Sequence, residues 1–528
     1  MRQSHRLNNI GLINRDKVIT FNFNGKSYQG YEGDTLASAL LANGVHLVGR
    51  SFKYHRPRGF IGAGVDEPNA KLQVTINGHS EPNINATEIE LVDGLSATSQ
   101  NCWPSVEFDI GAINNFLKRF FPAGFYYKTF MWPKSFWYKV YEPFIRKAAG
   151  LGVASLEKDK ERYEHKFEYC DLLVTGSGPS GLASAYAAAK NGAKVILAED
   201  KPRYGGTLLT DDVSIDNMSG KDWSEKIISE LKTMPNVTLK NRSQVFGYYD
   251  HNMMVMFERV GDHLSNKSKY TPRQRLWYIR AKETILSTGS IERPIVFGNN
   301  DTPGVVLSSA AKEYMKVYGV LVGRKPIIFT NNDSAYETAF EFKKNNVEPI
   351  ILDTREEHDS VVVQEAKNKG IQIKFSYGVI VANGYKKVKS AKIGKLTKDK
   401  KSFESTETIN CDCICVSGFW TPTVHLASQS GNKLKFDEKI DAFIPDKSKQ
   451  NEKTIGAANG SFTLQETIES GFKTGSELSS KITDKNNENK IPTVTETKYS
   501  VHDKFWCMPL PKNENPKRFV DFQNDVAV

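Results

Sequence analysis

The six residues from Gly176 to Gly181 have the composition and spacing of a loop that holds the pyrophosphate of a dinucleotide. They read Gly-Ser-Gly-Pro-Ser-Gly. The first glycine of such a loop makes a tight turn, the second lets the backbone approach the pyrophosphate, and the third lets the following helix pack on the strand. The N-terminus of that helix then faces the phosphate charge. We therefore expect Gly176, Gly178 and Gly181 to lie at a dinucleotide.

An acidic residue follows at the distance that this chemistry requires. Glu199 comes 18 positions after Gly181, at the end of the apolar run 195–198, where a carboxylate can accept hydrogen bonds from the adenosine ribose. A glycine pair at 205–206 allows the backbone to approach the cofactor a second time, at Gly206. The alternative is an ordinary strand–helix–strand unit with a glycine turn. The position of Glu199 favours the dinucleotide site.

The elements around this loop indicate a Rossmann unit. The apolar run 172–174 precedes the glycines and a helix rich in small residues follows them. A later strand, 283–286, leads into Thr-Gly, and a turn at 454–460 precedes a helix from about Leu464. This order is typical of flavoproteins with two dinucleotide-binding domains. In those proteins the final turn carries an Asp that holds the flavin ribityl chain, and here Ala458 stands in its place.

A second strand–helix–strand unit begins at residue 325. Its turn, residues 330–336, holds two asparagines and an aspartate but no glycine. These side chains tolerate tight turns, yet they occupy the space that a pyrophosphate would need. We expect this half to keep the fold without a tight dinucleotide site.

The N-terminal region, residues 17 to about 92, has the strand and turn order of the β-grasp domain of plant-type ferredoxins. Such ferredoxins hold an iron–sulfur cluster through four cysteines. The loop that should carry them, residues 56–69, contains no cysteine. We therefore expect no iron–sulfur cluster and a structural role for this module.

Composition excludes several classes of protein. Six cysteines in 528 residues form no disulfide framework, no run of about twenty apolar residues is present, and the N-terminus lacks an apolar signal core, so we expect a cytoplasmic protein. The net charge of +10 comes from scattered lysines, which indicates neither nucleic-acid nor membrane binding. Three cysteines at 411, 413 and 415 lie on one strand and read as core, so we expect no metal site. The aromatic stretch 114–151 is core, a partner interface or a membrane-surface patch, and the last is least favoured because the stretch shows no sustained amphipathic period.

We predict an α/β protein with the two-dinucleotide-binding-domain, glutathione-reductase-like Rossmann architecture, preceded by a β-grasp ferredoxin-like module without cluster cysteines. The expected segments are the β-grasp module (1–100), an aromatic-rich helical connector (101–168), the NAD-binding Rossmann domain (169–310 with 450–480), a second, degenerate Rossmann-like domain (311–449), and a linker with the start of a missing C-terminal half (481–528).

Several longer strings carry a resemblance to a known family. They are residues 53–59, 66–70, 122–130, 246–252, 329–336 and 416–426. Through them the chain closely resembles the alpha subunits of heterotetrameric sarcosine oxidases, from near its N-terminus to residue 528. Those subunits continue into a second half that resembles the aminomethyltransferase of the glycine cleavage system and binds tetrahydrofolate, and this sequence stops where that half is introduced.

The resemblance implies an oxidoreductase that acts on the CH–NH group of sarcosine in a complex with beta, gamma and delta subunits, and that is inactive as an isolated chain. The products are glycine, hydrogen peroxide and either formaldehyde or 5,10-methylenetetrahydrofolate. It also implies FAD in the beta subunit, FMN at the alpha–beta interface and NAD in this chain. Carried over by matching positions, the NAD contacts are Ser180, Glu199, Asp200, Lys201, Thr207, Val245, Ala458, Phe462, Thr463 and Leu464.

Two other functions remain open on the residues alone. One is a stand-alone FAD- and NAD(P)H-dependent pyridine nucleotide oxidoreductase, although no redox Cys pair follows Gly206. The other is a non-catalytic scaffold whose nucleotide is structural. No side chain in the sequence stands in a constellation that identifies it as catalytic.

Overall fold

The computed structural model describes residues 3–116, 132–150, 152–265, 267–485, 487, 489–496, 502–511 and 514–528, except for the side chains of 147–149. The chain forms two compact units. Unit 1 contains residues 1–160, 294–419 and 500–528, and unit 2 contains residues 161–293 and 420–499. Residues 117–131 and 151 of the predicted aromatic stretch lie outside the described residues. The boundaries of the five predicted segments stay a prediction.

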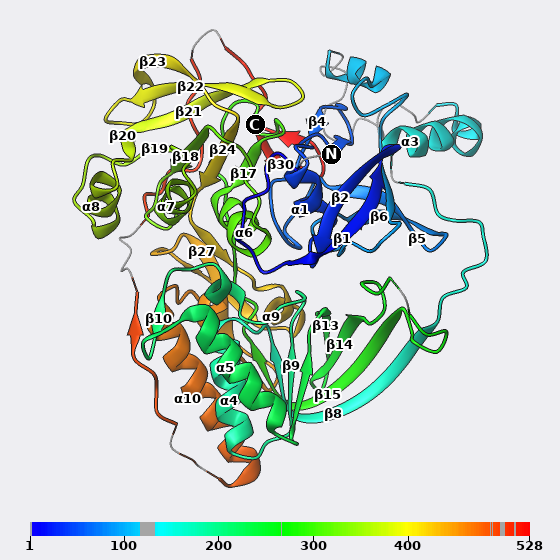
Figure 1. Ribbon diagram of the computed structural model, residues 1–528, viewed down its shortest axis with the longest axis vertical. Helices are drawn as coiled ribbons and strands as arrows, with labels where there is room; N and C mark the ends of the chain where they lie inside the picture. The colour runs from blue at the N-terminus through cyan, green and yellow to red at the C-terminus, as the bar shows by residue number, and fades with distance from the viewer. Residues whose placement is uncertain are drawn as a thin grey trace. The chain divides into compact units, whose positions relative to one another are not determined.

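Unit 2 is built on a seven-stranded sheet with the order β12-β9-β8-β15-β14-β13, in which β28 also pairs with β15 (Figure 1). Strands β12, β9, β8, β15 and β28 are parallel, and β13, β14 and β15 form an antiparallel extension. The strands are β8 (Tyr163–Thr175), β9 (Val195–Ala198), β12 (Val237–Lys240), β13 (Ser243–Tyr249), β14 (Met253–Arg259), β15 (Gln274–Leu286) and β28 (Glu452–Thr454).

Helices α4 (Pro179–Lys190) and α10 (Leu464–Thr483) pack side by side against this sheet (Figure 1). Their contact is close because α10 presents glycines to the backbone of α4, as described below. The remaining elements of unit 2 are η5 (Gly206–Leu209), α5 (Gly220–Thr233), α9 (His425–Gln429), η6 (Gly456–Asn459), and the short strands β10 (Ser214–Ile215), β11 (Met218–Ser219), β16 (Ser290–Glu292), β25 (Trp420–Pro422), β26 (Lys433–Asp437), β27 (Ala442–Lys447) and β29 (Val494–Thr495).

The N-terminal part of unit 1 is a five-stranded sheet of order β2-β1-β7-β5-β6, in which β1 and β7 are parallel. Asn24 and Gly25 have positive φ and form the hairpin turn between β1 and β2, and Thr35 caps α1 by accepting a hydrogen bond from the Ser38 N–H. The elements are β1 (Asn14–Phe23), β2 (Lys26–Glu32), α1 (Leu36–Ala42), β3 (Gly49–Arg50), β4 (Pro57–Arg58), β5 (Lys71–Ile76), β6 (His79–Asn85), β7 (Ser96–Ser99), η1 (Ile110–Asn115), η3 (Lys134–Phe136), η4 (Trp137–Tyr141) and α3 (Glu142–Ala149).

Unit 1 also contains a second parallel sheet, of order β17-β24-β18-β19-β20, and an antiparallel sheet, β21-β22-β23. Cys413 and Cys415 are buried in β24. The elements are β17 (Val305–Leu307), α6 (Ser308–Tyr318), β18 (Pro326–Thr330), α7 (Tyr336–Lys344), β19 (Ile350–Asp353), α8 (Val361–Asn368), β20 (Gln372–Phe375), β21 (Tyr377–Gly384), β22 (Val388–Leu396), β23 (Phe403–Asn410), β24 (Cys413–Ser417), β30 (Phe519–Asp521) and β31 (Val526–Ala527).

The C-terminal residues return to the second parallel sheet of unit 1. Directly after β18, Asn331 accepts a hydrogen bond at its backbone oxygen from the Asp503 N–H (3.0 Å), and its Nδ2 donates to the carbonyls of Asp503 (2.8 Å) and Phe505 (3.2 Å). After β24, the Phe419 ring stacks on His502 with centroids 4.1 Å apart. The segment therefore lies at the carboxyl ends of β18 and β24.

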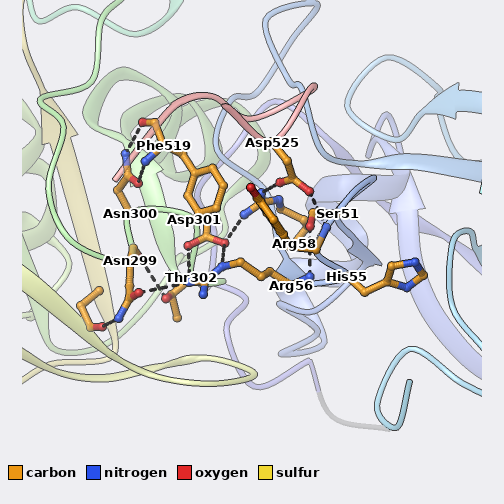
Figure 2. Close-up of polar contacts among 12 residues, drawn as sticks. Ser51, His55, Arg56, Arg58, Asn299, Asn300, Asp301, Thr302, Phe519 and Asp525 are labelled. Atoms are coloured by element: carbon orange, nitrogen blue, oxygen red, sulfur yellow. Dashed lines mark hydrogen bonds and ion pairs between the residues drawn. The ribbon is translucent and has the colours of Figure 1, made fainter. Parts of the chain in front are cut away.

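A buried ion network holds the C-terminal hairpin β30–β31 to the N-terminal module (Figure 2). The Arg58 guanidinium donates to carboxylates of both Asp301 and Asp525, and Arg56 donates to Asp301 through Nε (2.6 Å) and Nη2 (2.8 Å). Phe519 lies against Arg58, with its ring centroid 4.7 Å from Cζ. The two arginines hold the pKa of the Asp301 carboxyl below its usual value, although burial opposes this.

Among the described residues no helix combines the length and apolar character needed to cross a membrane.

Candidate dinucleotide site

The three glycines of the predicted loop lie in three different environments in unit 2. Gly176 has φ of +97°, which favours glycine, and its N–H donates to the Ala198 carbonyl (2.8 Å). A Cβ at Gly181 would lie 1.9 Å from the Gly176 oxygen, so only glycine fits where α4 meets the loop. A Cβ at Gly178 would meet no atom within 4 Å. Only Gly178 therefore faces open space, at the N-terminus of α4.

The Glu199 carboxylate ties this loop to the end of β9. Its Oε2 accepts hydrogen bonds from the Ser177 N–H (2.9 Å) and Oγ (2.5 Å), and its Oε1 accepts one from the Lys201 N–H (3.0 Å). Burial and the neighbouring Asp200 charge raise the pKa of Glu199 to about 8. Only Oε1 keeps room for a further donor, because a carboxylate offers about four lone-pair sites, two on each oxygen, and Oε2 already accepts two hydrogen bonds.

Backbone hydrogen bonds at the end of β9 position the other predicted contacts around Glu199. The Ser243 N–H, at the start of β13, donates to the Glu199 carbonyl (2.7 Å), and Val245 lies two residues further along that strand. The Asp200 carbonyl accepts a hydrogen bond from Arg259 Nη2 (2.7 Å). The structure thus brings Asp200 and Lys201 beside Glu199, and β13 runs from the same point.

The glycine pair lies directly against the loop. Gly205 and Gly206 have φ of +126° and +55°, and a Cβ at Gly206 would lie 2.9 Å from the Gly178 Cα. The Gly205 N–H donates to the Ser177 carbonyl (3.1 Å). Gly206 and Thr207 begin η5, so this element starts against the Gly178 backbone.

The turn that contains Ala458 closes the opposite side. A Cβ at Gly456 would lie 2.6 Å from Ser180 Oγ, so this turn touches the start of α4. Ala458 itself is fully buried. Residues 462–464 lead into α10, where the Thr463 side chain caps the helix by accepting from the Glu466 N–H (3.3 Å).

Two residues at this site were missed by the sequence reasoning. Ser177 occupies a variable position of the glycine pattern, and its hydroxyl could not be assigned a partner before Glu199 was placed. Glu496 lies 32 positions after Leu464. Its carboxylate accepts hydrogen bonds from the N–H groups of Leu464 (2.6 Å) and Gln465 (3.0 Å), and the sequence around it carries no motif.

The arrangement is suited to binding and orienting a ligand. Within the part of the chain that the structure describes, no group of three or more His, Cys, Asp or Glu side chains is placed to hold a metal ion. The loop itself contains no cysteine. Cys170 lies in β8, before the loop, where it is buried, and burial raises the pKa of its thiol to about 12.

Two family models match parts of the chain. Residues 16–102 match the model described as "2Fe-2S iron-sulfur cluster binding domain", and residues 171–252 match the model described as "FAD dependent oxidoreductase". The second match covers the end of β8, the glycine loop, Glu199 and the start of the antiparallel extension.

The first match overturns one prediction. We expected no iron–sulfur cluster because the loop at 56–69 has no cysteine, but residues 16–102 match a cluster-binding domain. The missing cysteines of one loop do not decide the family of a domain. The loop offers a carboxylate: Glu67 accepts hydrogen bonds from the N–H groups of Ile61 (2.6 Å), Gly62 (2.8 Å) and Asn69 (2.7 Å). Cys102 is the one thiol in the matched range, whereas such clusters usually take four cysteine ligands.

Curated relatives match almost the whole chain. The sarcosine oxidase subunit alpha of Rhizobium meliloti (strain 1021) is 41% identical over 99% of this chain and 52% of its own length. The resemblance to sarcosine oxidase alpha subunits is confirmed. The protein of the same name from Corynebacterium sp. (strain U-96) is 32% identical over 88% of this chain and 43% of its own length. The chain thus spans about half the length of the curated relatives it matches.

A solved structure agrees at the level of the fold. The crystal structure of L-proline dehydrogenase from P. horikoshii superposes with a TM-score of 0.61 at 20% identity, covering 92% of this chain and 77% of that chain. Together with the family matches, this shows a Rossmann-like fold of the FAD-dependent oxidoreductase type with an N-terminal domain of the iron–sulfur-binding family.

Proposed function

We propose that this chain is the NAD-binding subunit of a complex that oxidatively demethylates sarcosine. The observation that carries the proposal is the open space at Gly178, bounded by the N-terminus of α4, by Gly206 and, at the end of β9, by the Glu199 carboxylate. A pyrophosphate at Gly178 would face the positive end of the α4 dipole. The adenosine ribose would then lie within reach of Glu199.

The identity of the dinucleotide is argued from the turn at η6. A flavin ribityl chain carries several hydroxyl groups, and Ala458 offers it no polar side chain. NAD has no ribityl chain, so the loss of an Asp at this position removes nothing that NAD needs. This favours NAD over FAD in this chain and weighs against the stand-alone flavin reductase. The predicted division into two dinucleotide-binding domains, the second degenerate, forms part of the same proposal.

The role of these residues is to bind and orient. The loop offers backbone N–H groups, and Glu199 is placed to accept ribose hydroxyls. Among the described residues, no atom lies within 4 Å of a Cβ placed at Gly178. NAD supplies hydride-transfer chemistry when it is bound. Sarcosine oxidation, the flavins and the beta, gamma and delta partners are proposed from the resemblance to the curated relatives.

The proposal is tested by purifying the chain and identifying its nucleotide by mass spectrometry and absorbance. We expect NAD in about one equivalent, no flavin absorbance, and no hydrogen peroxide when sarcosine is supplied to the isolated chain. Addition of a cognate beta subunit should give peroxide. Stoichiometric FAD in the isolated chain would overturn the NAD assignment, and peroxide from that chain alone would overturn the subunit assignment.

A further inference from the structure

Helices α4 and α10 run parallel in unit 2, and their points of contact show how far the N-terminus of α10 extends past the start of α4. A Cβ at Gly471 would lie 2.5 Å from the Ser180 oxygen, and a Cβ at Gly475 would lie 2.3 Å from the Ser184 oxygen. Both contacts advance by four residues on each helix. Because α10 begins at Leu464, seven residues before Gly471, its N-terminus projects about 10 Å beyond the level of Ser180.

The projecting end lies on the side of the site that faces away from Glu199. In the sheet, β9 is on one side of β8, and β15 with β28 is on the other. Glu199 follows β9 and α10 follows β28. With its pyrophosphate at Gly178 and its adenosine toward Glu199, a dinucleotide extends its second nucleoside toward the N-terminus of α10.

The first N–H groups of α10, which have no partner within the helix, donate to a side chain instead. Leu464 and Gln465 both donate to the Glu496 carboxylate, at 2.6 Å and 3.0 Å. Glu496 is held in place by the strand before it, since β29 pairs antiparallel with β10. Just beyond this pairing, Asp216 exchanges hydrogen bonds with Thr493, from its N–H to the Thr493 carbonyl (2.9 Å) and from the Thr493 N–H to its Oδ1 (2.9 Å).

We propose that Glu496 determines which second nucleoside the site accepts. This rests on the proposed function, because it concerns the same dinucleotide. The carboxylate occupies two N–H donors that would otherwise bind a carbonyl oxygen, and it presents further acceptors to the ligand. The site therefore favours a nucleoside whose base offers hydrogen-bond donors, such as the carboxamide N–H₂ of nicotinamide riboside. It disfavours an isoalloxazine, whose pyrimidine ring presents two carbonyl oxygens.

The test measures dissociation constants of NAD, FAD and ADP-ribose on the full chain with Glu496→Ala and Glu496→Gln. ADP-ribose shares the adenosine and pyrophosphate but lacks a second base. Freeing two N–H donors should shift the ratio of FAD to NAD affinity toward FAD by about tenfold in Glu496→Ala, with a smaller shift in Glu496→Gln. The affinity for ADP-ribose should change by less than about twofold. Glu477→Gln, at an exposed pair with Lys481 further along α10, is the matched control.

The outcomes separate this inference from the proposed function. Wild-type protein that binds ADP-ribose and NAD, with an unchanged FAD-to-NAD ratio in both Glu496 variants, would overturn the role of Glu496 alone. Wild-type protein that binds neither ADP-ribose nor NAD would overturn the proposed function and this inference with it. If Glu496→Ala does not fold, as judged by circular dichroism, Glu496→Gln decides the question through the same ratio.

Discussion

Arg58 and Asp525 lie 467 positions apart in the sequence and form an ion pair closed to solvent (Figure 2). The same Asp525 carboxylate accepts hydrogen bonds from the N–H groups of Lys53 (2.8 Å) and Tyr54 (3.0 Å). Nearby, Asn300 exchanges two hydrogen bonds with the backbone of Phe519, both of 2.8 Å. The C-terminal hairpin is therefore part of the core of unit 1 and joins the N-terminal module to the loop after β16.

Replacing Asp525 by Asn should destabilise unit 1 strongly. The change leaves Arg56 and Arg58 to share the single carboxylate of Asp301, and breaking a buried pair from one side costs about 3–5 kcal/mol. The loss of stability is measured by chemical denaturation, with hydrogen exchange of the N-terminal module as the probe of unfolding. The control is Glu514→Gln, which removes a half-exposed pair with Lys392 and should cost less than about 1 kcal/mol. Equal stabilities of the two variants would contradict the network.

The glycine loop predicts opposite effects for two neighbouring substitutions. Gly181→Ala should destabilise unit 2, because the new Cβ would lie 1.9 Å from a backbone oxygen. Gly178→Ala should leave the melting temperature nearly unchanged, since its φ is −67° and its Cβ meets no atom within 4 Å. It should nevertheless weaken dinucleotide binding, because the methyl group fills the space proposed for the pyrophosphate. Calorimetry and a binding titration on both variants check this; tight NAD binding by Gly178→Ala would place the phosphates elsewhere.

Dinucleotide binding should release a proton near neutral pH. Burial, followed by the charge of Asp200, raises the pKa of Glu199 to about 8, so the unliganded folded chain holds this carboxyl protonated at pH 7. Ribose hydroxyls donate to the ionised form and lower its pKa, so affinity should rise with pH up to about 8 and then level off. Titration calorimetry in two buffers of different ionisation enthalpy measures the released proton. A Glu199→Gln variant should bind more weakly and show no such release.

The raised pKa of Glu199 also makes the stability of the fold depend on pH. Between pH 4.5, the ordinary pKa of a glutamate, and about pH 8, Glu199 keeps a proton in the folded state that it has lost in the unfolded state. The contribution of Glu199 to the free energy of unfolding therefore falls as pH rises through this window. Unfolding of wild type and Glu199→Gln at pH 5 and pH 8 should show a smaller loss in the variant; parallel losses would refute the assignment.

Selectivity for NAD over NADP should depend on the acidic pair after β9. Asp200, and Glu199 once it has released its proton, would face a 2′-phosphate with like charge, whereas Lys201 and Arg203 nearby reduce the repulsion. We expect the wild type to prefer NAD by about tenfold and Asp200→Asn to narrow the difference. Equal affinities of the wild type for NAD and NADP would show that the pair does not read the 2′ position.

What the sequence could predict was local. The strand, glycine turn and helix around Gly176–Gly181 are specified by neighbouring residues, and Glu199 follows at a spacing set by one helix and one strand. The partners of Arg58 and the position of Glu496 depend on chain segments that meet only after folding, and no periodicity marks them. The cluster prediction was wrong because it judged a domain by the side chains of one loop, while family membership is carried by the whole of residues 16–102.

Open α/β sheets usually bind ligands at the carboxyl ends of their strands, and in unit 1 the carboxyl end of β18 is such a position. There the Asn331 side chain binds the backbone of Asp503 and Phe505. Residues 503–505 belong to the same polypeptide, so their local concentration at β18 is set by the chain that connects them and does not depend on the concentration of metabolites in solution. A free nucleotide would have to displace a partner that cannot diffuse away. We therefore expect the second sheet to respond little to the nucleotide pool, and we expect any response of the chain to that pool to arise in unit 2.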